Sequence, residues 1–152
     1  MSIQARFVHT NLIAQDWKKL ATFYEQVFGC TPVPPERDLA GQWLDDATRV
    51  LNARIHGMHL RLPGYGDTGP TLEIFQYDQE EERPGTSINR PGFAHVAFAV
   101  DDVQAAQDAV VAAGGSALGE RVTVDIPGAG HITFVYATDP EGNIIELQHW
   151  SH

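Results

Sequence analysis

Residues 92–103 read Gly-Phe-Ala-His-Val-Ala-Phe-Ala-Val-Asp-Asp-Val, and the same pattern occurs earlier in the chain. A shift of 86 positions aligns four pairs, Phe7 with Phe93, His9 with His95, Asp16 with Asp102 and Gly29 with Gly115. Agreement of a histidine, a helix-capping aspartate and a helix-ending glycine at one spacing indicates an internal repeat. The chain is therefore predicted to contain the same structural unit twice.

The ends of the two halves align at a different spacing. A shift of 73 positions places Leu72-Glu73-Ile74 on Ile145-Glu146-Leu147. The first half is thus 13 residues longer than the second between its helix and its last strand. The proline-rich connection from Thr31 to Asn52 is the natural place for this extra length.

Hydrophobic periodicity and turn residues divide each half into one helix and several strands. In the first half we expect a strand over 5–12, a helix between the cap Asp16 and Gly29, an irregular proline-rich stretch, and strands over 53–62 and 71–77. In the second half we expect a strand over 93–100, a helix capped by Asp101 or Asp102 that ends at Gly114, and strands over 121–126, 131–137 and 144–150. The predicted fold is α+β, with two tandem βαβββ modules, module one over about 1–80 and module two over about 90–152, in a single domain over 1–152.

Charge and cysteine content exclude several classes of protein. The chain has 152 residues, 20 acidic and 10 basic, for a formal charge of −10. It has no basic stripe, so neither nucleic acid nor an anionic membrane is expected as a partner. The apolar runs are too short to span a bilayer. Cys30 is the single cysteine, so a cytoplasmic location is expected.

A metal site is predicted from two histidines and two glutamates at repeat-equivalent positions, His9, Glu73, His95 and Glu146. Each glutamate lies in a strand between two apolar residues, which half buries its carboxylate. A buried carboxylate must be paired, hydrogen-bonded or bound to metal. Imidazole nitrogens with carboxylate oxygens suit one divalent Zn, Ni, Co, Fe or Mn. Two alternatives stay open: Glu73 could pair with an arginine, or could support a three-ligand site by hydrogen bonding.

The chain resembles the vicinal oxygen chelate superfamily, which includes glyoxalase I, methylmalonyl-CoA epimerase, extradiol dioxygenases and bleomycin-resistance proteins. The resemblance rests on Phe7-Val8-His9-Thr10, on Thr71-Leu72-Glu73-Ile74-Phe75, on residues 92–103, and on Thr138-Asp139-Pro140-Glu141-Gly142-Asn143-Ile144-Ile145-Glu146-Leu147. It implies a glyoxalase-like fold in which the modules form a cupped mixed sheet around one metal. It also implies His9, Glu73, His95 and Glu146 as ligands, and a homodimer.

The resemblance further implies a metal-dependent lyase, isomerase or epimerase. Such an enzyme would act on a small carbonyl or thioester substrate through a metal-bound enediolate, with Glu146 as the first candidate for the catalytic base and Glu73 as the second. One alternative is an extradiol-type Fe(II) dioxygenase that uses His9, His95 and Glu146. A second alternative is a drug-binding protein similar to bleomycin-resistance proteins.

The sequence defines the substrate less well than the metal. The run His9-Thr10-Asn11-Leu12-Ile13 lacks the arginine that glyoxalase I often carries there for glutathione. An anionic substrate could be bound by the strand over 53–62, through Arg54, His56, His59 and Arg61. His131 follows a glycine-rich loop and is a further candidate for substrate contact.

Overall fold

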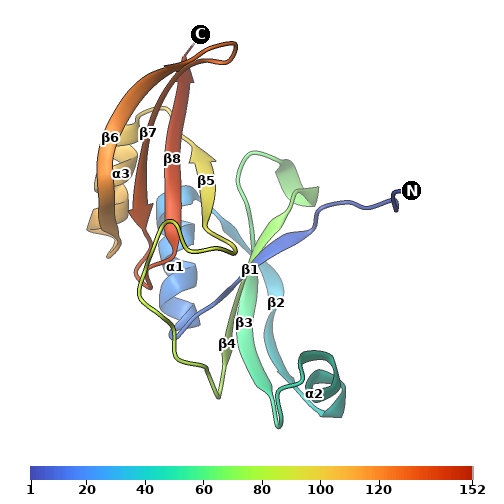
Figure 1. Cartoon of the computed structure of the whole chain (residues 1–152). Helices are drawn as coiled ribbons and strands as arrows, with labels where there is room; N and C mark the ends of the chain where they lie inside the picture. Colours follow the sequence, from blue (N-terminus) through green and yellow to red (C-terminus); the bar gives the residue numbers. More distant parts are fainter. Residues whose placement is uncertain (152) are drawn as a thin grey trace. The chain divides into compact units, whose positions relative to one another are not determined.

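The computed structural model describes residues 1–151, which form two compact units, Met1–Glu82 and 83–151 (Figure 1). Each unit is built on a four-stranded mixed sheet. The first contains β1 (His9–Ile13), α1 (Trp17–Phe28), β2 (Thr31–Ala40), α2 (Gln42–Thr48), β3 (Arg54–Arg61), η1 (Gly66–Thr68) and β4 (Thr71–Tyr77). The second contains β5 (His95–Ala99), α3 (Val103–Ala112), β6 (Ser116–Ile126), β7 (Gly130–Thr138) and β8 (Ile144–Ser151).

The two sheets have the same topology, as the predicted repeat requires. Their strand orders are β1-β4-β3-β2 and β5-β8-β7-β6, so each module is a βαβββ unit. In each, the first strand pairs in parallel with the last, and the remaining neighbours are antiparallel. This placement puts His9 and Glu73 on adjacent strands, and His95 and Glu146 on adjacent strands. The predicted α+β fold is confirmed.

The helix boundaries follow from capping residues. The Asp16 carboxylate accepts a hydrogen bond from the backbone N–H of Lys19 at 3.1 Å and begins α1. Gly29 ends α1 in the left-handed conformation, with φ of 69°. Asp102, rather than Asp101, caps α3, because its carboxylate accepts from the N–H of Ala105 at 2.9 Å. These side-chain caps satisfy backbone groups that a helix end leaves without partners.

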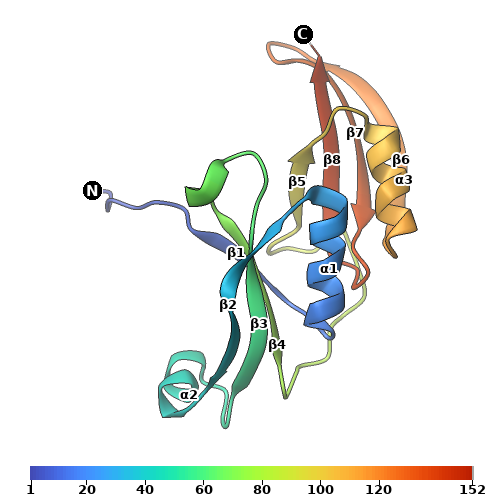
Figure 2. The same cartoon turned by 180° about the vertical axis from the view of Figure 1, so that it is seen from behind.

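The core of the first unit lies between α1 and its sheet (Figure 2). Leu20 and Tyr24 of α1 are fully buried, as are Leu60 of β3 and Ile74 of β4. Gln76 ties the helix to the sheet, since its side-chain oxygen accepts from the backbone N–H of Trp17 at 3.0 Å. Because strand side chains alternate, the neighbours of these core residues on β3 and β4 point to the face away from α1.

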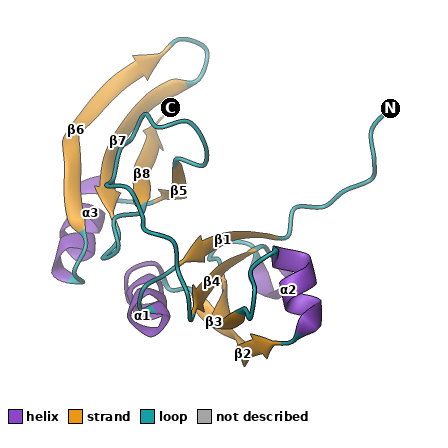
Figure 3. Ribbon diagram, turned by 60° about the horizontal axis from the view of Figure 1, so that its bottom comes forward, coloured by secondary structure: helices purple, strands orange, loops and turns teal. Residues whose placement is uncertain are grey.

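The second unit is built in the same way. Helix α3 packs against β6, β7 and β8 (Figure 3). Val110 of α3 is fully buried, as are Val135 of β7 and Ile145 and Leu147 of β8. Glu146 lies between these two buried residues of β8, so its side chain points to the face away from α3.

The expectation that Pro32, Pro34 and Pro35 break regular structure is wrong. They lie within β2, which pairs with β3 on both sides of a register shift between Val33 and Arg37. Strand β2 is at the edge of its sheet, where a residue without an N–H costs no ladder hydrogen bond. The shift accommodates the two later prolines.

Strand ends also differ from the sequence-based boundaries. Strands β1 and β5 begin later than predicted, at His9 and His95, and β6 begins earlier, at Ser116. The extra length of the first half lies where it was predicted, because α2 falls within residues 31–52. Leu44 of α2 packs with Ala53 and Ile55 in a small cluster of its own. Of the helices within residues 1–151, none has the length and apolar character needed to cross a bilayer.

Candidate metal centre

Three ligand-bearing side chains of the first unit gather on the sheet face away from α1. His9, His59 and Glu73 each offer a donor atom, and these atoms all lie within 4.8 Å of one another. His59 Nε2 is 2.7 Å from Glu73 Oε2, and His9 Nε2 is 3.5 Å from Glu73 Oε1. The rings of His9 and His59 meet edge to face, with centroids 5.7 Å apart.

Strand register explains why these three side chains meet. Glu73 lies on the central strand β4, directly opposite His59 of β3 and Asn11 of β1. Directly opposed residues of neighbouring strands project on the same face. His9 is two residues before Asn11, so its side chain shares that face as well. The face therefore brings imidazoles from both neighbouring strands to one central carboxylate.

Glu73 is held at both of its oxygens. Its side chain is buried, with 11% of its surface exposed, so the carboxylate needs partners in place of water. Asn11 Nδ2 donates to Oε1 at 2.8 Å, and His59 approaches Oε2. The second ring nitrogen of His59 lies 3.3 Å from the Thr71 hydroxyl. These contacts fix the orientation of the carboxylate.

The electrostatic surroundings favour a neutral His59. Burial lowers the pKa of His59, because a charged imidazolium is poorly solvated there. The Glu73 carboxylate opposes this effect, whereas electrostatic interactions with Arg37, His9 and Arg61 add to it. A neutral imidazole can both donate to a carboxylate and accept at its other nitrogen, and it is the form that binds metals.

The second unit carries an equivalent pair. His95 Nε2 lies 4.0 Å from Glu146 Oε2, and Gln148 Nε2 donates to the same oxygen at 2.8 Å. The His95 ring meets Tyr136 at a centroid distance of 5.2 Å. Tyr136 lies opposite Glu146 in the strand register, as His59 lies opposite Glu73. The repeat therefore places an aromatic or imidazole ring beside each His–Glu pair.

His59 is the residue whose role sequence reasoning missed. The sequence pointed to it only as a contact for an anionic substrate, because the repeat offers tyrosine, not histidine, at the equivalent position. The register of β3 against β4 places it beside Glu73, and that register cannot be read from periodicity alone. The only signal in the sequence was a histidine within a predicted strand close in sequence to the strand that carries Glu73.

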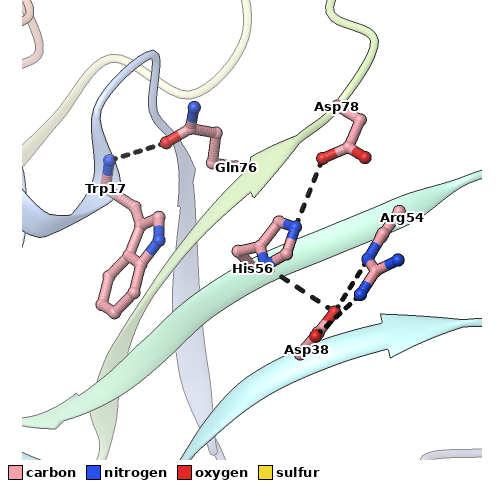
Figure 4. Close-up of polar contacts among 6 residues, drawn as sticks. All are labelled: Trp17, Asp38, Arg54, His56, Gln76 and Asp78. Carbon is pink, nitrogen blue, oxygen red and sulfur yellow. Dashed lines mark hydrogen bonds and ion pairs between the residues drawn. The ribbon is translucent and has the colours of Figure 1, made fainter.

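Two of the predicted substrate residues lie on the other face of the sheet. His56 is opposite Gln76, whose side chain reaches α1, so both point toward the helix side (Figure 4). His56 stands between two carboxylates, 3.7 Å from Asp38 and 3.3 Å from Asp78. Arg54 donates two hydrogen bonds to Asp38, at 3.0 and 2.9 Å.

His131, a further predicted substrate residue, lies in the second unit. Its Nδ1 is 3.5 Å from an Asp125 oxygen, and more than half of its side chain is exposed. The predicted substrate roles of Arg54, His56 and His131 stay predictions. The structure gives each of them an acidic neighbour instead.

Comparison with known proteins establishes the family. The sequence model of the Glyoxalase/Bleomycin resistance protein/Dioxygenase superfamily matches residues 6–147. The chain belongs to this superfamily. Its members share the paired βαβββ arrangement found in both units.

Individual relatives agree with this assignment. A probable lactoylglutathione lyase of Vibrio parahaemolyticus is 32% identical over 145 residues, covering 93% of this chain and 88% of that protein. A probable lactoylglutathione lyase of Vibrio cholerae is 30% identical with the same coverage. The crystal structure of a glyoxalase family protein from Bacillus cereus matches all of this chain and 97% of its own, with a TM-score of 0.74 and 16% identity. That last similarity concerns the fold alone.

The donor set of the first unit fits a divalent metal. Ligand nitrogens and oxygens lie about 2.0–2.2 Å from Zn, so two atoms bound to one such ion are at most about 4.4 Å apart. The donor atoms of His9, His59 and Glu73 already come within 4.8 Å of one another. Small side-chain rotations therefore suffice to bring His9 and Glu73 around one ion, while His59 stays beside the same carboxylate. Imidazole and carboxylate together favour Zn, Ni, Co, Fe or Mn over Ca.

Proposed function

We propose that the chain is a metal-dependent lyase, isomerase or epimerase of the glyoxalase superfamily that acts on a small carbonyl or thioester substrate through an enediolate. The gathering of His9, His59 and Glu73 on one sheet face is the observation that carries this proposal. The two Vibrio relatives support a lyase. A drug-binding protein with an apolar site would not need a carboxylate buried between two imidazoles, because burial of a carboxylate is costly.

We propose His9, Glu73, His95 and Glu146 as the ligands of one divalent metal. The internal repeat supports this set, because it places the same two residue types on equivalent strands of each unit. His59 then acts on Glu73 rather than on the metal. Both nitrogens of its ring already have partners, Glu73 and the Thr71 hydroxyl. Metal-binding carboxylates are commonly oriented by such hydrogen bonds.

Bound by these residues, a divalent cation supplies a Lewis acid that stabilises negative charge on two neighbouring substrate oxygens. The remaining chemistry is a proton transfer, for which the chain offers two carboxylates. Glu146 is the better base, because only its Oε2 has a hydrogen-bond partner within residues 1–151, whereas both oxygens of Glu73 are held. A base must reach the substrate proton, and a less constrained carboxylate can do so.

The proposed reaction moves a proton within the substrate and consumes no other reactant. Glu146 takes the proton from the carbon next to the carbonyl, and the C–H electron pair forms a C=C bond while the carbonyl oxygen becomes an oxyanion. When the deprotonated carbon carries a hydroxyl, that hydroxyl passes its proton to the oxyanion and becomes the new carbonyl, and return of the Glu146 proton to the former carbonyl carbon completes an isomerisation. Return of the proton to the original carbon on its opposite face completes an epimerisation. Glu73 stays a fixed ligand throughout.

An oxygenase is the second candidate. Two imidazoles and one carboxylate are the donor set of non-haem Fe(II) oxygenases, and the first unit offers that set in His9, His59 and Glu73. Oxygen uptake with catechols by Fe(II)-loaded protein would support this candidate. We favour the lyase or isomerase because Glu146 provides a carboxylate for the proton transfer in addition to the fixed Glu73 carboxylate.

Hydrogen–deuterium exchange tests the proposed reaction. The metal-loaded chain is incubated in D₂O with glutathione hemithioacetals of 2-oxoaldehydes and with acyl-CoA thioesters, and NMR follows deuterium at the carbon next to the carbonyl. Exchange without oxygen uptake is expected, together with its loss in Glu146→Gln. Glu120→Gln is the matched control, since Glu120 is exposed on β6 of the same unit. Exchange that persists in Glu146→Gln would reject Glu146 as the base.

The homodimer and the cytoplasmic location are also proposals. The first is supported by the superfamily and the second by the single cysteine, Cys30, which is buried and free. Light scattering coupled to size-exclusion chromatography measures the mass in solution. A mass of one chain would reject the homodimer.

A further inference from the structure

A cavity beside the His59–Glu73 contact concentrates positive charge in an acidic protein. Its volume is about 210 Å³, and it lies wholly within the first unit. Its polar lining comes from three arginines, one histidine and two threonines, namely Arg6, Arg37, Arg61, His59, Thr68 and Thr71. The chain has only eight arginines and a formal charge of −10, so three in one cavity is a marked local excess of positive charge.

These guanidinium groups have no acidic partners. Within residues 1–151, no Asp or Glu oxygen lies within ion-pair distance of Arg6, Arg37 or Arg61. Arg54 shows the contrast, since its guanidinium is 2.9 Å from the Asp38 carboxylate. Guanidinium groups that face a cavity without a carboxylate leave positive charge available for an incoming anion.

Backbone carbonyls fix two of the three groups in place. Arg61 Nη1 donates to the carbonyl oxygen of Gly69, and Arg37 Nη1 donates to the carbonyl oxygens of Val33 and Pro35. Each of these bonds uses one of five N–H donors, so several remain for a ligand. The charge is therefore held in position without being neutralised, and binding an anion would cost little side-chain entropy.

The cavity is placed for a substrate of the adjacent site. His59 and Thr71 line it, and His59 is also 2.7 Å from the Glu73 carboxylate. Phe7, Val8 and Val33 add apolar atoms to its lining. A cavity of about 150 Å³ is enough for benzene, so this one has room for a small charged group.

We propose that this cavity binds an oxyanion, a carboxylate or a phosphoryl group, that forms one arm of the substrate. The inference rests on the proposed function and narrows it to substrates whose reacting carbonyl lies near an anionic group. The guanidinium groups of Arg6, Arg37 and Arg61 bind the oxyanion through charge-assisted hydrogen bonds, and the reacting end of the substrate lies toward Glu73.

Calorimetric titration of the full chain with two probes, inorganic phosphate and succinate, tests the inference independently of turnover. The titrations are run on the protein as purified and after dialysis against a chelator. At least one probe is expected to bind both the protein as purified and the chelator-treated protein. The probe with the lower dissociation constant identifies the substrate arm as phosphoryl or carboxylate. Binding by neither probe, or binding that disappears with the metal, would overturn the proposal.

Arginine variants locate the binding. Arg37→Gln and Arg61→Gln should each weaken binding about tenfold or more, the usual loss for one hydrogen bond to a charged group. Arg6→Gln should also weaken anion binding. This variant should leave the stability of the fold unchanged, because Arg6 makes no hydrogen bond within the described residues. Arg49→Gln is the matched control, exposed in the same unit and outside the cavity.

The two proposals fail in different ways. Equal weakening by Arg49→Gln, or no weakening by the three cavity variants, would reject the oxyanion site even if hydrogen–deuterium exchange is observed. Oxyanion binding that depends on Arg37 and Arg61 in a protein that exchanges no carbonyl substrate would reject the enzymatic function and keep the site.

Discussion

Removal of the His59 side chain should weaken metal binding through its effect on Glu73. In His59→Ala, the Glu73 carboxylate loses the partner at 2.7 Å from Oε2 and keeps Asn11 at Oε1. A hydrogen bond to a charged group contributes about 1.5–3 kcal/mol. Loss of a residue that orients a metal ligand costs about 10–100-fold in affinity, or ~1.4–2.7 kcal/mol. The two estimates agree, so a loss of about 10–100-fold is expected.

Competition with a chromogenic chelator measures this loss, and a second variant identifies its cause. The amide of His59→Gln can still donate to Glu73 but is a poor ligand for Zn, Ni, Co, Fe or Mn. If His59 acts through Glu73, His59→Gln should recover most of the affinity that His59→Ala loses. Tyr136→Phe, at the equivalent position of the second unit, is the matched control and should stay within about threefold of the unchanged chain, less than ~0.7 kcal/mol.

Two results would refute this reasoning. Equal losses in His59→Gln and His59→Ala, with one imidazole fewer around Co(II) by X-ray absorption, would make His59 a direct ligand. Unchanged affinity in His59→Ala would show that the contact with Glu73 has no role in metal binding. Far-ultraviolet circular dichroism of each variant excludes unfolding as the cause.

Four further predictions concern stability and reactivity. Leu72→Ala, at a position that is 1% exposed, should lower the free energy of unfolding by about 2–5 kcal/mol in urea denaturation, whereas Leu51→Ala, at an exposed position, should change it by less than about 0.5 kcal/mol. Asp102→Ala should cost about 1 kcal/mol through loss of the α3 cap, and Asp101→Ala much less; equal costs would contradict the assignment of the cap to Asp102. Burial raises the pKa of the Cys30 thiol from 9.0 to about 11, so native Cys30 should react with iodoacetamide far more slowly than the unfolded chain at pH 8. Because the folded state then holds a proton that the unfolded chain releases, stability should fall as the pH rises from about 9 to 11.

The repeat made most of the fold predictable. Capping residues such as Asp16 and Gly29 located α1, and alternating apolar residues located β4 from Thr71 to Tyr77. Strand β2 was not predictable in this way, because its prolines are unfavourable within a sheet except at an edge. Whether a strand lies at an edge depends on the sheet order, which local sequence does not contain.

The site was predictable only in part. The repeat predicted His9, Glu73, His95 and Glu146 as one ligand set, and the structure places each histidine and the glutamate of its own unit on adjacent strands. The positions of His59 and of the arginines beside it depend on the register of β3 and on the path of β2. His56 is only three residues from His59 yet points to the other face, so a histidine-rich strand alone did not show which ring would reach Glu73.

Anomalous X-ray diffraction at the absorption edge of the bound metal, measured on crystals of the metal-loaded chain, tests most directly whether His9 and Glu73 bind a divalent ion. We expect one anomalous peak per chain within bonding distance of His9 Nε2 and a Glu73 oxygen, with His95 and Glu146 completing the ligand set. A peak bound elsewhere, or crystals that contain the metal while His9 and Glu73 remain in contact only with each other and with protein side chains, would contradict the account.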